Sequence, residues 1–226
     1  MWGYNIYGQV GIGSTEDQTI PVKVLENVRL PIANAGDEGN PFADVDPTGW
    51  QFEPAKFVYK RGLMTGKGKD EAGKIIFDPN ATLTRAEFAQ SLYSAEGKPS
   101  MEYTSLFQDV AAGQWFTNAV LWAGSNKLVS GYPNGNYGVS DNITREQLAA
   151  ILYKYAEYKK YDISARAEID GYTDADLISS WAKEQLRWAV ANGIMKGKDD
   201  RLDPQGNATR AECAAMLRSF FTRFGE

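Results

Sequence analysis

The feature that most constrains the fold of this 226-residue chain is a pattern that occurs three times between residues 42 and 224. Each occurrence has an aromatic-x-Asp motif, then a Trp, a Gly and a Thr-Arg pair, in the same order, and successive aspartates are 65 residues apart. Because four landmarks keep one order three times, the sequence predicts three structural repeats. The landmarks are Asp44, Asp109 and Asp174; Trp50, Trp115 and Trp181; Gly66, Gly131 and Gly197; and Arg85, Arg145 and Arg210.

Each repeat is predicted to contain two helices joined by a loop rich in Gly, Pro, Asn and Asp, with no substantial sheet. The first helix follows the Trp, and Gly62 and Gly193 stand where a left-handed C-terminal cap is expected. Lys127 occupies that position in the second repeat, where a side chain is less favourable. Pro54 predicts that the first helix of the first repeat begins late. An insertion in the first repeat, around residues 68–74, is predicted to be a loop.

The second helix of each repeat begins with a capping-box pattern, a Thr followed three residues later by Glu or Gln. These capping residues are Thr84 and Glu87, Thr144 and Gln147, and Thr209 and Glu212. An apolar stripe follows each box, so the three second helices are predicted to bury their stripes against one another. The predicted fold is mainly α: a pseudo-threefold, three-pronged spindle of three two-helix repeats around a central three-helix bundle, with a short N-terminal β or coil remnant.

Composition excludes several kinds of chemistry. The chain has no His, one Cys and a formal net charge of −5. Without His there is no Ser-His-Asp triad, no Cys-His pair and no His-ligated metal site, and no cofactor or metal is predicted. A mildly acidic chain is a poor binder of nucleic acid, and no apolar run is long enough for membrane insertion. Cys213 falls at an apolar helical position and is interpreted as a core residue.

Helix formation does not explain the arginines that follow each capping Thr. Arg85, Arg145 and Arg210 each stand at the first helical position, where the helix dipole disfavours a cation. One interpretation is a salt bridge to a neighbouring carboxylate, for instance the landmark Asp of an adjacent repeat. The other is anion capture, in which the guanidinium and the free N–H groups of the helix start bind a carboxylate or phosphate. The residues alone favour neither.

The tryptophans and glycines also have two interpretations. Trp122 and Trp188 lie on apolar helical faces and are interpreted as core. For the landmark Trp at the start of each first helix, core anchoring is favoured over a place in a sugar-binding groove, which needs a flat apolar face beside polar groups. The landmark Gly of each repeat either lets a ligand approach the backbone or turns the chain.

The order Phe-x-Asp-Val, Trp, Gly-Tyr-Pro-x-Gly and Thr-Arg-Ala-Glu resembles the S-layer homology domain, present in triplicate over residues 42–224. The resemblance implies a helical spindle that binds the secondary polysaccharide of a bacterial cell wall without covalent attachment. In that family the ligand is often a pyruvate-ketal-bearing sugar in grooves between adjacent repeats, and the motif Arg contacts its anionic group. The ligand-binding residues that this implies are Arg85, Arg145, Arg210, Trp50, Trp115, Trp181, Gly66, Gly131, Gly197, Tyr132, Lys67 and Lys198.

The repeats depart from the family pattern in different ways. The second reads Thr-Arg-Glu-Gln, and the added carboxylate of Glu146 is expected to weaken anion binding in its groove. Tyr132 belongs to the one complete Gly-Tyr-Pro-x-Gly motif. Lys67 and Lys198 take its place in the other two repeats, either as added groove charge or as solvated loop residues. The three grooves are therefore predicted not to be equivalent.

Residues 1–29 resemble one repeat of a regulator-of-chromosome-condensation type β-propeller, through Trp-Gly-x-Asn-x-x-Gly-Gln-x-Gly-x-Gly at residues 2–13. A single blade cannot bury its own faces, so the segment is interpreted as the last blade of a propeller. The sequence begins without a signal peptide, and we expect a C-terminal fragment of a longer protein. The predicted domains are this fragment at 1–29, a linker at 30–41, and repeats 1, 2 and 3 at 42–100, 101–165 and 166–226.

The sequence thus predicts a non-enzymatic anchoring module at the cell wall, outside the cell, whose partner is an anionic, pyruvylated wall polysaccharide. It predicts no nucleic-acid partner, no membrane insertion and a monomer in which three repeats imitate a trimer. The alternative is a protein-interaction or S-layer lattice-forming module that binds no glycan. A carbohydrate-active enzyme is disfavoured, because nothing singles out the pair of carboxylates that glycoside hydrolysis needs.

Overall fold

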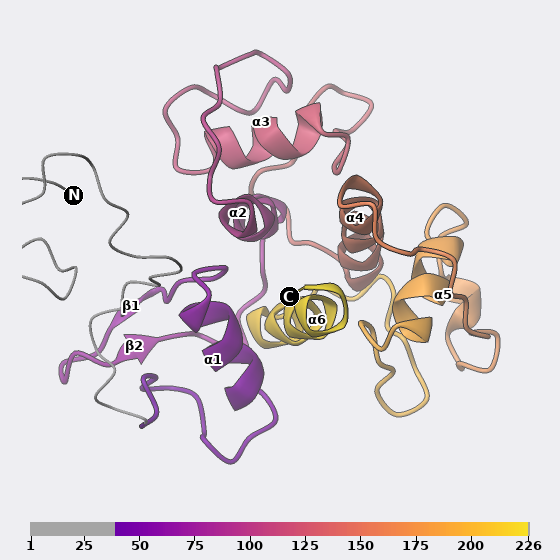
Figure 1. Cartoon of the computed structure of the whole chain (residues 1–226), viewed down its shortest axis with the longest axis horizontal. Helices are drawn as coiled ribbons and strands as arrows, with labels where there is room; N and C mark the ends of the chain where they lie inside the picture. Colours follow the sequence, from indigo (N-terminus) through magenta and orange to yellow (C-terminus); the bar gives the residue numbers. More distant parts are fainter. Residues whose placement is uncertain (1–38, 226) are drawn as a thin grey trace, which may run out of the picture. The chain divides into compact units, whose positions relative to one another are not determined.

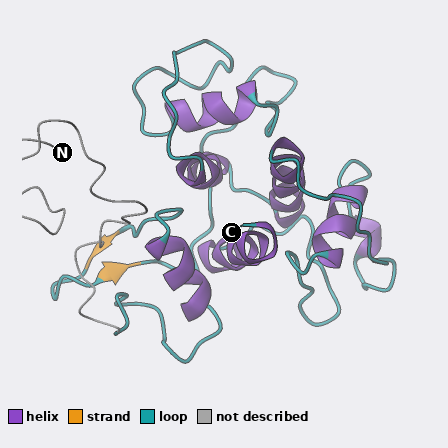
Figure 2. Cartoon of the chain, viewed as in Figure 1, coloured by secondary structure: helices purple, strands orange, loops and turns teal. Residues whose placement is uncertain are grey.

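The computed structural model describes residues 39–225, and from Asn40 onward the chain forms one compact unit (Figure 1). The fragment predicted at 1–29 and most of the linker lie outside the described residues. The described chain is mainly helical, as predicted (Figure 2). Its helices are α1 (Phe52–Lys60), α2 (Arg85–Ala95), α3 (Thr117–Ser125), α4 (Arg145–Tyr158), the 3-10 helix η1 (Ala175–Leu177), α5 (Lys183–Ala191) and α6 (Arg210–Phe224). No helix among residues 39–225 has both the length and the apolar character needed to cross a membrane.

The insertion in repeat 1, which the sequence predicts to be a loop, is instead a short hairpin whose first strand takes up residues 68 and 69. Strands β1 (Gly68–Lys69) and β2 (Ile75–Ile76) pair antiparallel, with Gly68 opposite Ile76 and Lys69 opposite Ile75. Phe42, the first residue of the aromatic-x-Asp motif, forms a parallel bridge to Ile75. Within the described residues, β1 and β2 form the only sheet. This agrees with the prediction that the repeats contain no substantial sheet.

The first helices α1, α3 and α5 begin two residues after the landmark Trp in every repeat. The prediction that α1 begins late is wrong, because Pro54 lies in the first turn, where a helix leaves backbone N–H groups unpaired anyway. All three helices end in a left-handed residue: φ is 67° at Gly62, 66° at Gly193 and 60° at Lys127. Repeat 2 therefore adopts the same cap despite its side chain.

The second helices α2, α4 and α6 all begin with a complete capping box. The Thr hydroxyl accepts a hydrogen bond from the backbone N–H three residues later, and the Glu or Gln side chain accepts one from the Thr backbone N–H. Two otherwise unpaired donors are satisfied at each helix start. The predicted capping roles of Thr and Glu or Gln are present in all three repeats.

Each second helix packs against the first helix of the following repeat: α2 on α3, α4 on α5, and α6 back on α1. Figure 1 shows α2, α4 and α6 towards the middle, with α1, α3 and α5 outside them. The main partner of each second helix is thus an outer helix, whereas the sequence predicts that the second helices bury their stripes against one another. The last helix of the chain is held by the first.

Three short segments before the second helices form a closed ring of backbone hydrogen bonds. The N–H of Leu83 donates to the carbonyl of Ala208, Ala208 to Ile143, and Ile143 to Leu83, over 3.0, 2.9 and 2.9 Å. All three side chains are fully buried. One residue from each repeat therefore joins the repeats where the second helices begin.

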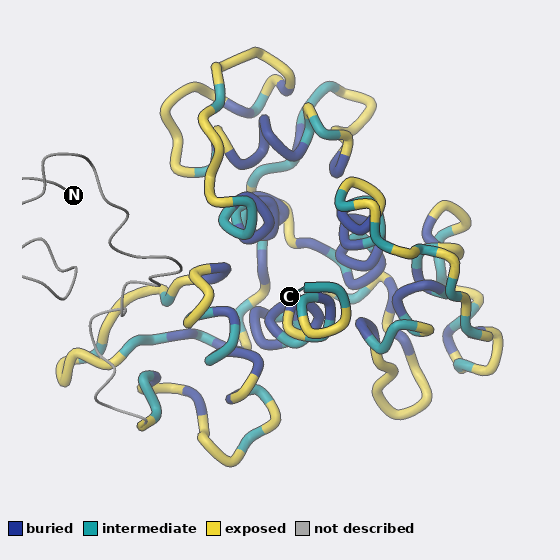
Figure 3. Tube along the Cα trace, viewed as in Figure 1, coloured by how far each residue is buried: buried dark blue, intermediate teal, exposed yellow. Residues whose placement is uncertain are grey.

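The core lies between the helices of each pair and around this ring, as the buried segments in Figure 3 show. Trp122 and Trp188 are buried in it, which confirms their core interpretation. Cys213 is fully buried, and burial raises the pKa of its thiol far above the ordinary value. A thiol that stays protonated is a poor nucleophile, so Cys213 acts as a small core residue.

The landmark aspartates tie each repeat together internally. Asp44 accepts from the backbone N–H groups of Phe77 and Asp78, at 2.8 and 2.7 Å. Asp174 accepts from Leu202 and Asp203, at 2.9 and 2.7 Å. In both cases the carboxylate joins the loop before the first helix to the loop before the second, and Asp109 does the same in repeat 2.

We predict that Lys127→Gly stabilises the protein. The left-handed conformation costs a residue with a Cβ roughly 1–2 kcal/mol, part of which is offset by the larger backbone entropy that Gly loses on folding. The free energy of unfolding, measured by urea denaturation, should rise by about 0.5–1 kcal/mol. Lys127→Ala removes the same charge and keeps the Cβ, so a matching gain in that control would contradict the explanation.

We also predict that Asp174 contributes to acid sensitivity. Burial by itself would raise the pKa of Asp174, but the N–H groups of Leu202 and Asp203 outweigh it and lower the pKa. The stabilisation is therefore complete above the unfolded pKa of about 3.9 and is lost as the pH falls through the lower folded value.

Asp174→Asn should accordingly reduce the free energy of unfolding near neutral pH and flatten its decline below about pH 4. The exposed Asp176→Asn removes the same charge and should change neither quantity. Urea unfolding curves over the acid range measure both, and an unchanged decline in Asp174→Asn would exclude this carboxylate as a cause.

Candidate binding grooves

Each arginine that follows a capping Thr is buried and reaches into the following repeat, with repeat 1 following repeat 3. Arg85, Arg145 and Arg210 begin α2, α4 and α6, and their exposed fractions are 6%, 7% and 4%. Nε and Nη2 of each guanidinium donate to two backbone carbonyls. The acceptors are Tyr137 and Ser130 for Arg85 (3.0 and 2.9 Å), Leu202 and Lys196 for Arg145 (2.9 and 3.1 Å), and Phe77 and Thr65 for Arg210 (2.8 and 2.6 Å).

The suggested salt bridge between these arginines and the landmark aspartates is not formed. The aspartates bind backbone N–H groups of their own repeat instead. Two arginines pair with the capping glutamates: Arg145 Nη1 lies 3.1 Å from Glu212 Oε1, and Arg210 Nη1 lies 4.0 Å from Glu87 Oε1. Arg145 and Arg210 are thus held by carbonyls of the next repeat and by a carboxylate of the next second helix.

One groove, named here the α6 groove, has a volume of about 860 Å³. It lies beside α6, between the loop that follows α5 and the start of α1. Five cationic side chains and one carboxylate line it. These are Arg145, Lys196, Lys198, Arg218, Arg223 and Glu212, and the remaining lining residues include Trp50, Pro54, Asn192, Gly197, Ser219 and Thr222.

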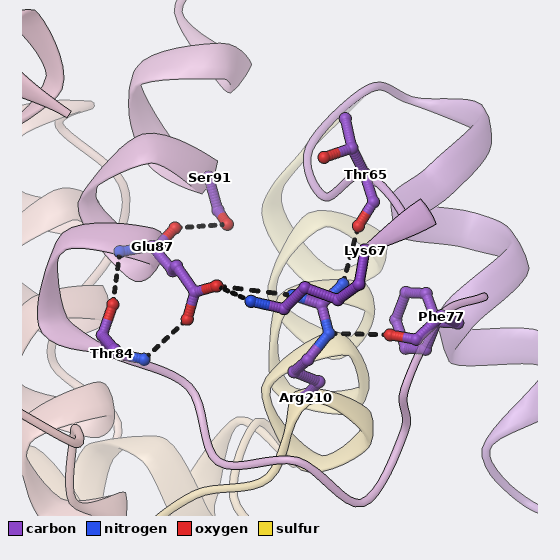
Figure 4. Close-up of polar contacts among 7 residues, drawn as sticks. All are labelled: Thr65, Lys67, Phe77, Thr84, Glu87, Ser91 and Arg210. Carbon is purple, nitrogen blue, oxygen red and sulfur yellow. Dashed lines mark hydrogen bonds and ion pairs between the residues drawn. The ribbon is translucent and has the colours of Figure 1, made fainter. Parts of the chain in front are cut away.

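The second groove, the α2 groove, has a volume of about 630 Å³ and lies beside α2, between the loop that follows α1 and the start of α3. Its charged residues are Lys67, Lys98, Arg210 and Glu87, and Gly66, Ser91 and Trp115 also line it. Figure 4 shows Glu87 directed at both Lys67 and Arg210. Burial would raise the pKa of Glu87, but Lys67 and the Thr84 N–H lower it, so the carboxylate stays ionised.

The surroundings of Arg85 are different. Two aromatic rings cover its guanidinium, Tyr137 at 4.7 Å and Tyr132 at 5.1 Å from the ring centroids. Gln147 takes the capping place of the glutamate, and within residues 39–225 no carboxylate lies within 4.0 Å of Arg85. Burial and a hydrogen bond with Asp141 raise the pKa of Tyr132. The Tyr that replaces Lys67 and Lys198 thus adds no charge and stacks on the arginine.

The landmark tryptophans are on the surface, with exposed fractions of 64%, 62% and 53% at Trp50, Trp115 and Trp181. The favoured interpretation as core anchors is therefore wrong. Each Trp stands before the first turn of its helix, off the buried stripe that Trp122 and Trp188 occupy. Trp50 lines the α6 groove and Trp115 the α2 groove, and each comes from the repeat that follows the second helix of that groove.

The landmark glycines are explained by close packing within their own repeat. A Cβ on Gly66 would lie 2.3 Å from Ile75 Cγ2, and one on Gly197 would lie 2.5 Å from Tyr172 Cε1. A Cβ on Gly131 would lie 2.7 Å from the Asn136 carbonyl. Gly66 also lines the α2 groove and Gly197 the α6 groove, so close packing inside the repeat leaves both accessible to a ligand in the groove.

The expected groove lysines are in place, since Lys67 lines the α2 groove and Lys198 the α6 groove. Glu146 lines neither groove: it is 4% exposed and accepts from the N–H and hydroxyl of Ser179 at 3.1 and 2.7 Å. Sequence reasoning missed Arg218 and Arg223. Helical spacing could have found Arg223, which lies seven and four residues along one face of α6 from Glu212 through Ser219. Arg218 lies off that face, four residues before Thr222, and this spacing does not mark it.

Comparison with known proteins identifies the family. The S-layer homology domain model matches residues 41–89, 106–149 and 171–214, together more than half of the chain, and the regulator of chromosome condensation (RCC1) repeat model matches residues 1–45. The chain therefore belongs to the S-layer homology domain family, and both resemblances read from the sequence are confirmed.

Curated relatives are larger proteins. The chain is 28% identical to an endoglucanase of Bacillus sp. (strain KSM-635) over 87% of its own length and 21% of the relative's. It is 28% identical to a cellulosome-anchoring protein of Acetivibrio thermocellus, over 81% and 39% of the two chains. It is 26% identical to the S-layer protein sap of Bacillus anthracis, over 92% and 24%. The chain thus spans less than half of each of these relatives.

Its family is one of cell-surface anchoring modules, located outside the cell.

We predict that Arg210 is needed for folding as well as for the groove. Arg210→Ala leaves the buried carbonyls of Phe77 and Thr65 without their side-chain donor, and the free energy of unfolding should fall by about 2–4 kcal/mol. The exposed Arg61→Ala should change it by less than about 1 kcal/mol. Urea denaturation of both variants measures the difference. Equal stability of Arg210→Ala and wild type would mean that this contact does not join the repeats.

Proposed function

We propose that the chain anchors a larger protein to the bacterial cell wall by binding an anionic secondary polysaccharide in the α6 and α2 grooves. The observation that carries the proposal is the composition of the two grooves. Each one combines a buried Arg at a helix start, one or more Lys on the adjoining loop, and an exposed Trp from the next repeat.

The cations supply the charge recognition. Backbone carbonyls of the next repeat already hold the guanidinium of Arg145 or Arg210 in place, so little side-chain entropy is lost when an anion binds. Lys198 or Lys67 adds a second positive charge in the same groove. The carboxylate of a pyruvate ketal on a sugar fits this arrangement. The same cations already pair with carboxylates of the protein, Arg145 with Glu212 and Lys67 with Glu87.

The tryptophans supply the sugar recognition. A flat indole face beside fixed polar groups is what a carbohydrate site uses to hold one face of a pyranose ring. Trp50 and Trp115 stand at the edge of the α6 and α2 grooves with more than half of their surface exposed. The indole faces of both residues are therefore accessible to a sugar in the grooves.

Each groove is lined by a single carboxylate, Glu212 or Glu87, and both are engaged in capping boxes. Glycoside hydrolysis needs a pair of carboxylates on the two sides of the bond. The grooves therefore support binding without catalysis. We also propose that the protein acts as a monomer, because α6 closes on α1 within one chain.

The experiment that tests the glycan is a pull-down on purified wall polysaccharide, before and after mild acid removal of its ketal groups. We expect binding to the intact polysaccharide and loss of binding after removal. Equal binding to both would overturn the acidic ketal as the ligand. No binding to either would overturn glycan recognition and favour the alternative module that interacts only with proteins or forms a lattice.

We predict that Trp50→Ala together with Trp115→Ala weakens wall binding at least about tenfold, since loss of a stacked ring costs about 1–3 kcal/mol per contact. Both residues are exposed, so the thermal unfolding midpoint should stay within a few degrees of wild type. Leu177→Ala, an exposed apolar residue outside both grooves, is the matched control. Unchanged binding of the double variant would exclude the tryptophans from the site.

A further inference from the structure

The α6 groove continues well beyond Arg145. Besides Glu212 at the start of α6, its lining includes Arg218 and Arg223 near the end of the helix. At 1.5 Å per residue, the eleven steps from Glu212 to Arg223 cover about 16 Å. One face of α6 therefore offers a groove floor longer than a single sugar, with cationic groups at both ends.

The two distal arginines are exposed and lack a carboxylate partner. Within residues 39–225, no carboxylate lies within 4.0 Å of either guanidinium, and the side chain of Arg218 makes no hydrogen bond. Arg223 Nε donates to Asn192 Oδ1 at 3.3 Å. Arg223 also acts on the carboxylate of Asp162, but it lowers the pKa of Asp162 less than the hydrogen bonds from Ser164 do. Both guanidinium groups are available to an anion.

The corresponding positions of the other two second helices carry different residues. Tyr93 and Tyr153 take the place of Arg218, and they pack on Trp122 and Trp188 at centroid distances of 5.9 and 5.3 Å. Lys98 and Tyr158 take the place of Arg223. The pair of arginines is therefore specific to α6 and is not required by the helix packing that the three repeats share.

We propose that the distal half of the α6 groove is a second anionic subsite, which takes a further carboxylate or phosphate group of the same polysaccharide whose first acidic group lies at Arg145. The proposal rests on the proposed function. Guanidinium groups bind either anion through a planar fork of donors. Ser219 and Thr222 lie between the two cationic ends and offer hydroxyl groups to the sugar that joins the two acids. The α6 groove has two arginines where the α2 groove has only Lys98, so it favours a multiply acidic chain more strongly.

The test compares wild type with Arg218→Gln/Arg223→Gln by titration calorimetry. The probes are cell-wall oligosaccharides from the bacterium that makes this protein, separated by anion exchange into singly and multiply acidic fractions. Lys60→Gln/Lys74→Gln removes the same two charges from exposed positions outside both grooves and serves as the control.

The arginine variant should bind the multiply acidic fraction about five- to tenfold more weakly and the singly acidic fraction as wild type does. The difference should shrink as salt is raised, because both arginines are exposed. Equal losses for both fractions, or a loss in the lysine control, would overturn the subsite. If wild type binds and the arginine variant is unchanged, the subsite alone fails. If wild type binds neither fraction, the proposed function fails as well.

Discussion

The contact between the arginine at each second helix start and the loop of the following repeat is the interaction on which the domain depends. A cation with only a few per cent of its surface exposed must be paired or hydrogen-bonded, because the free-energy cost of removing it from water otherwise exceeds the net stability of a domain. Arg210 meets this requirement with the carbonyls of Phe77 and Thr65, more than 130 residues away in sequence. The same contact in three places, with the ring through Leu83, Ile143 and Ala208, converts a linear array into a closed one.

That closure also positions the grooves. Because each arginine is held by the next repeat, its charge lies at a boundary between repeats. At Arg145 and Arg210, a loop and a Trp from two different repeats line the groove beside that charge. The two grooves differ in charge: Lys196, Arg218 and Arg223 add to the α6 groove, whereas the α2 groove has only Lys98 beyond the shared Arg and Lys. At Arg85 the ring of Tyr132 replaces the lysine. The repeats are therefore structurally alike and electrostatically distinct.

The acidic balance of the whole chain gives these local cations their significance. With a formal net charge of −5, the surface as a whole repels anions, and attraction is confined to the places where arginines and lysines gather. Arginine keeps its charge across the pH range that a cell wall meets, which suits a binding site outside the cell. The lysines add positive charge to the grooves, whereas Arg145 and Arg210 are held in place by carbonyls of the next repeat.

The sequence by itself determined the three repeats, the capping boxes at Thr84, Thr144 and Thr209, and the left-handed ends of the first helices, because these depend on residues a few positions apart. It also distinguished the buried Trp122 and Trp188, since helical periodicity marks a core face. Only the tertiary structure decided that the landmark tryptophans are exposed and that the arginines pair with carbonyls. A backbone carbonyl has no residue type to recognise, and a groove exists only where a second helix, a loop and a Trp from separate repeats meet in space.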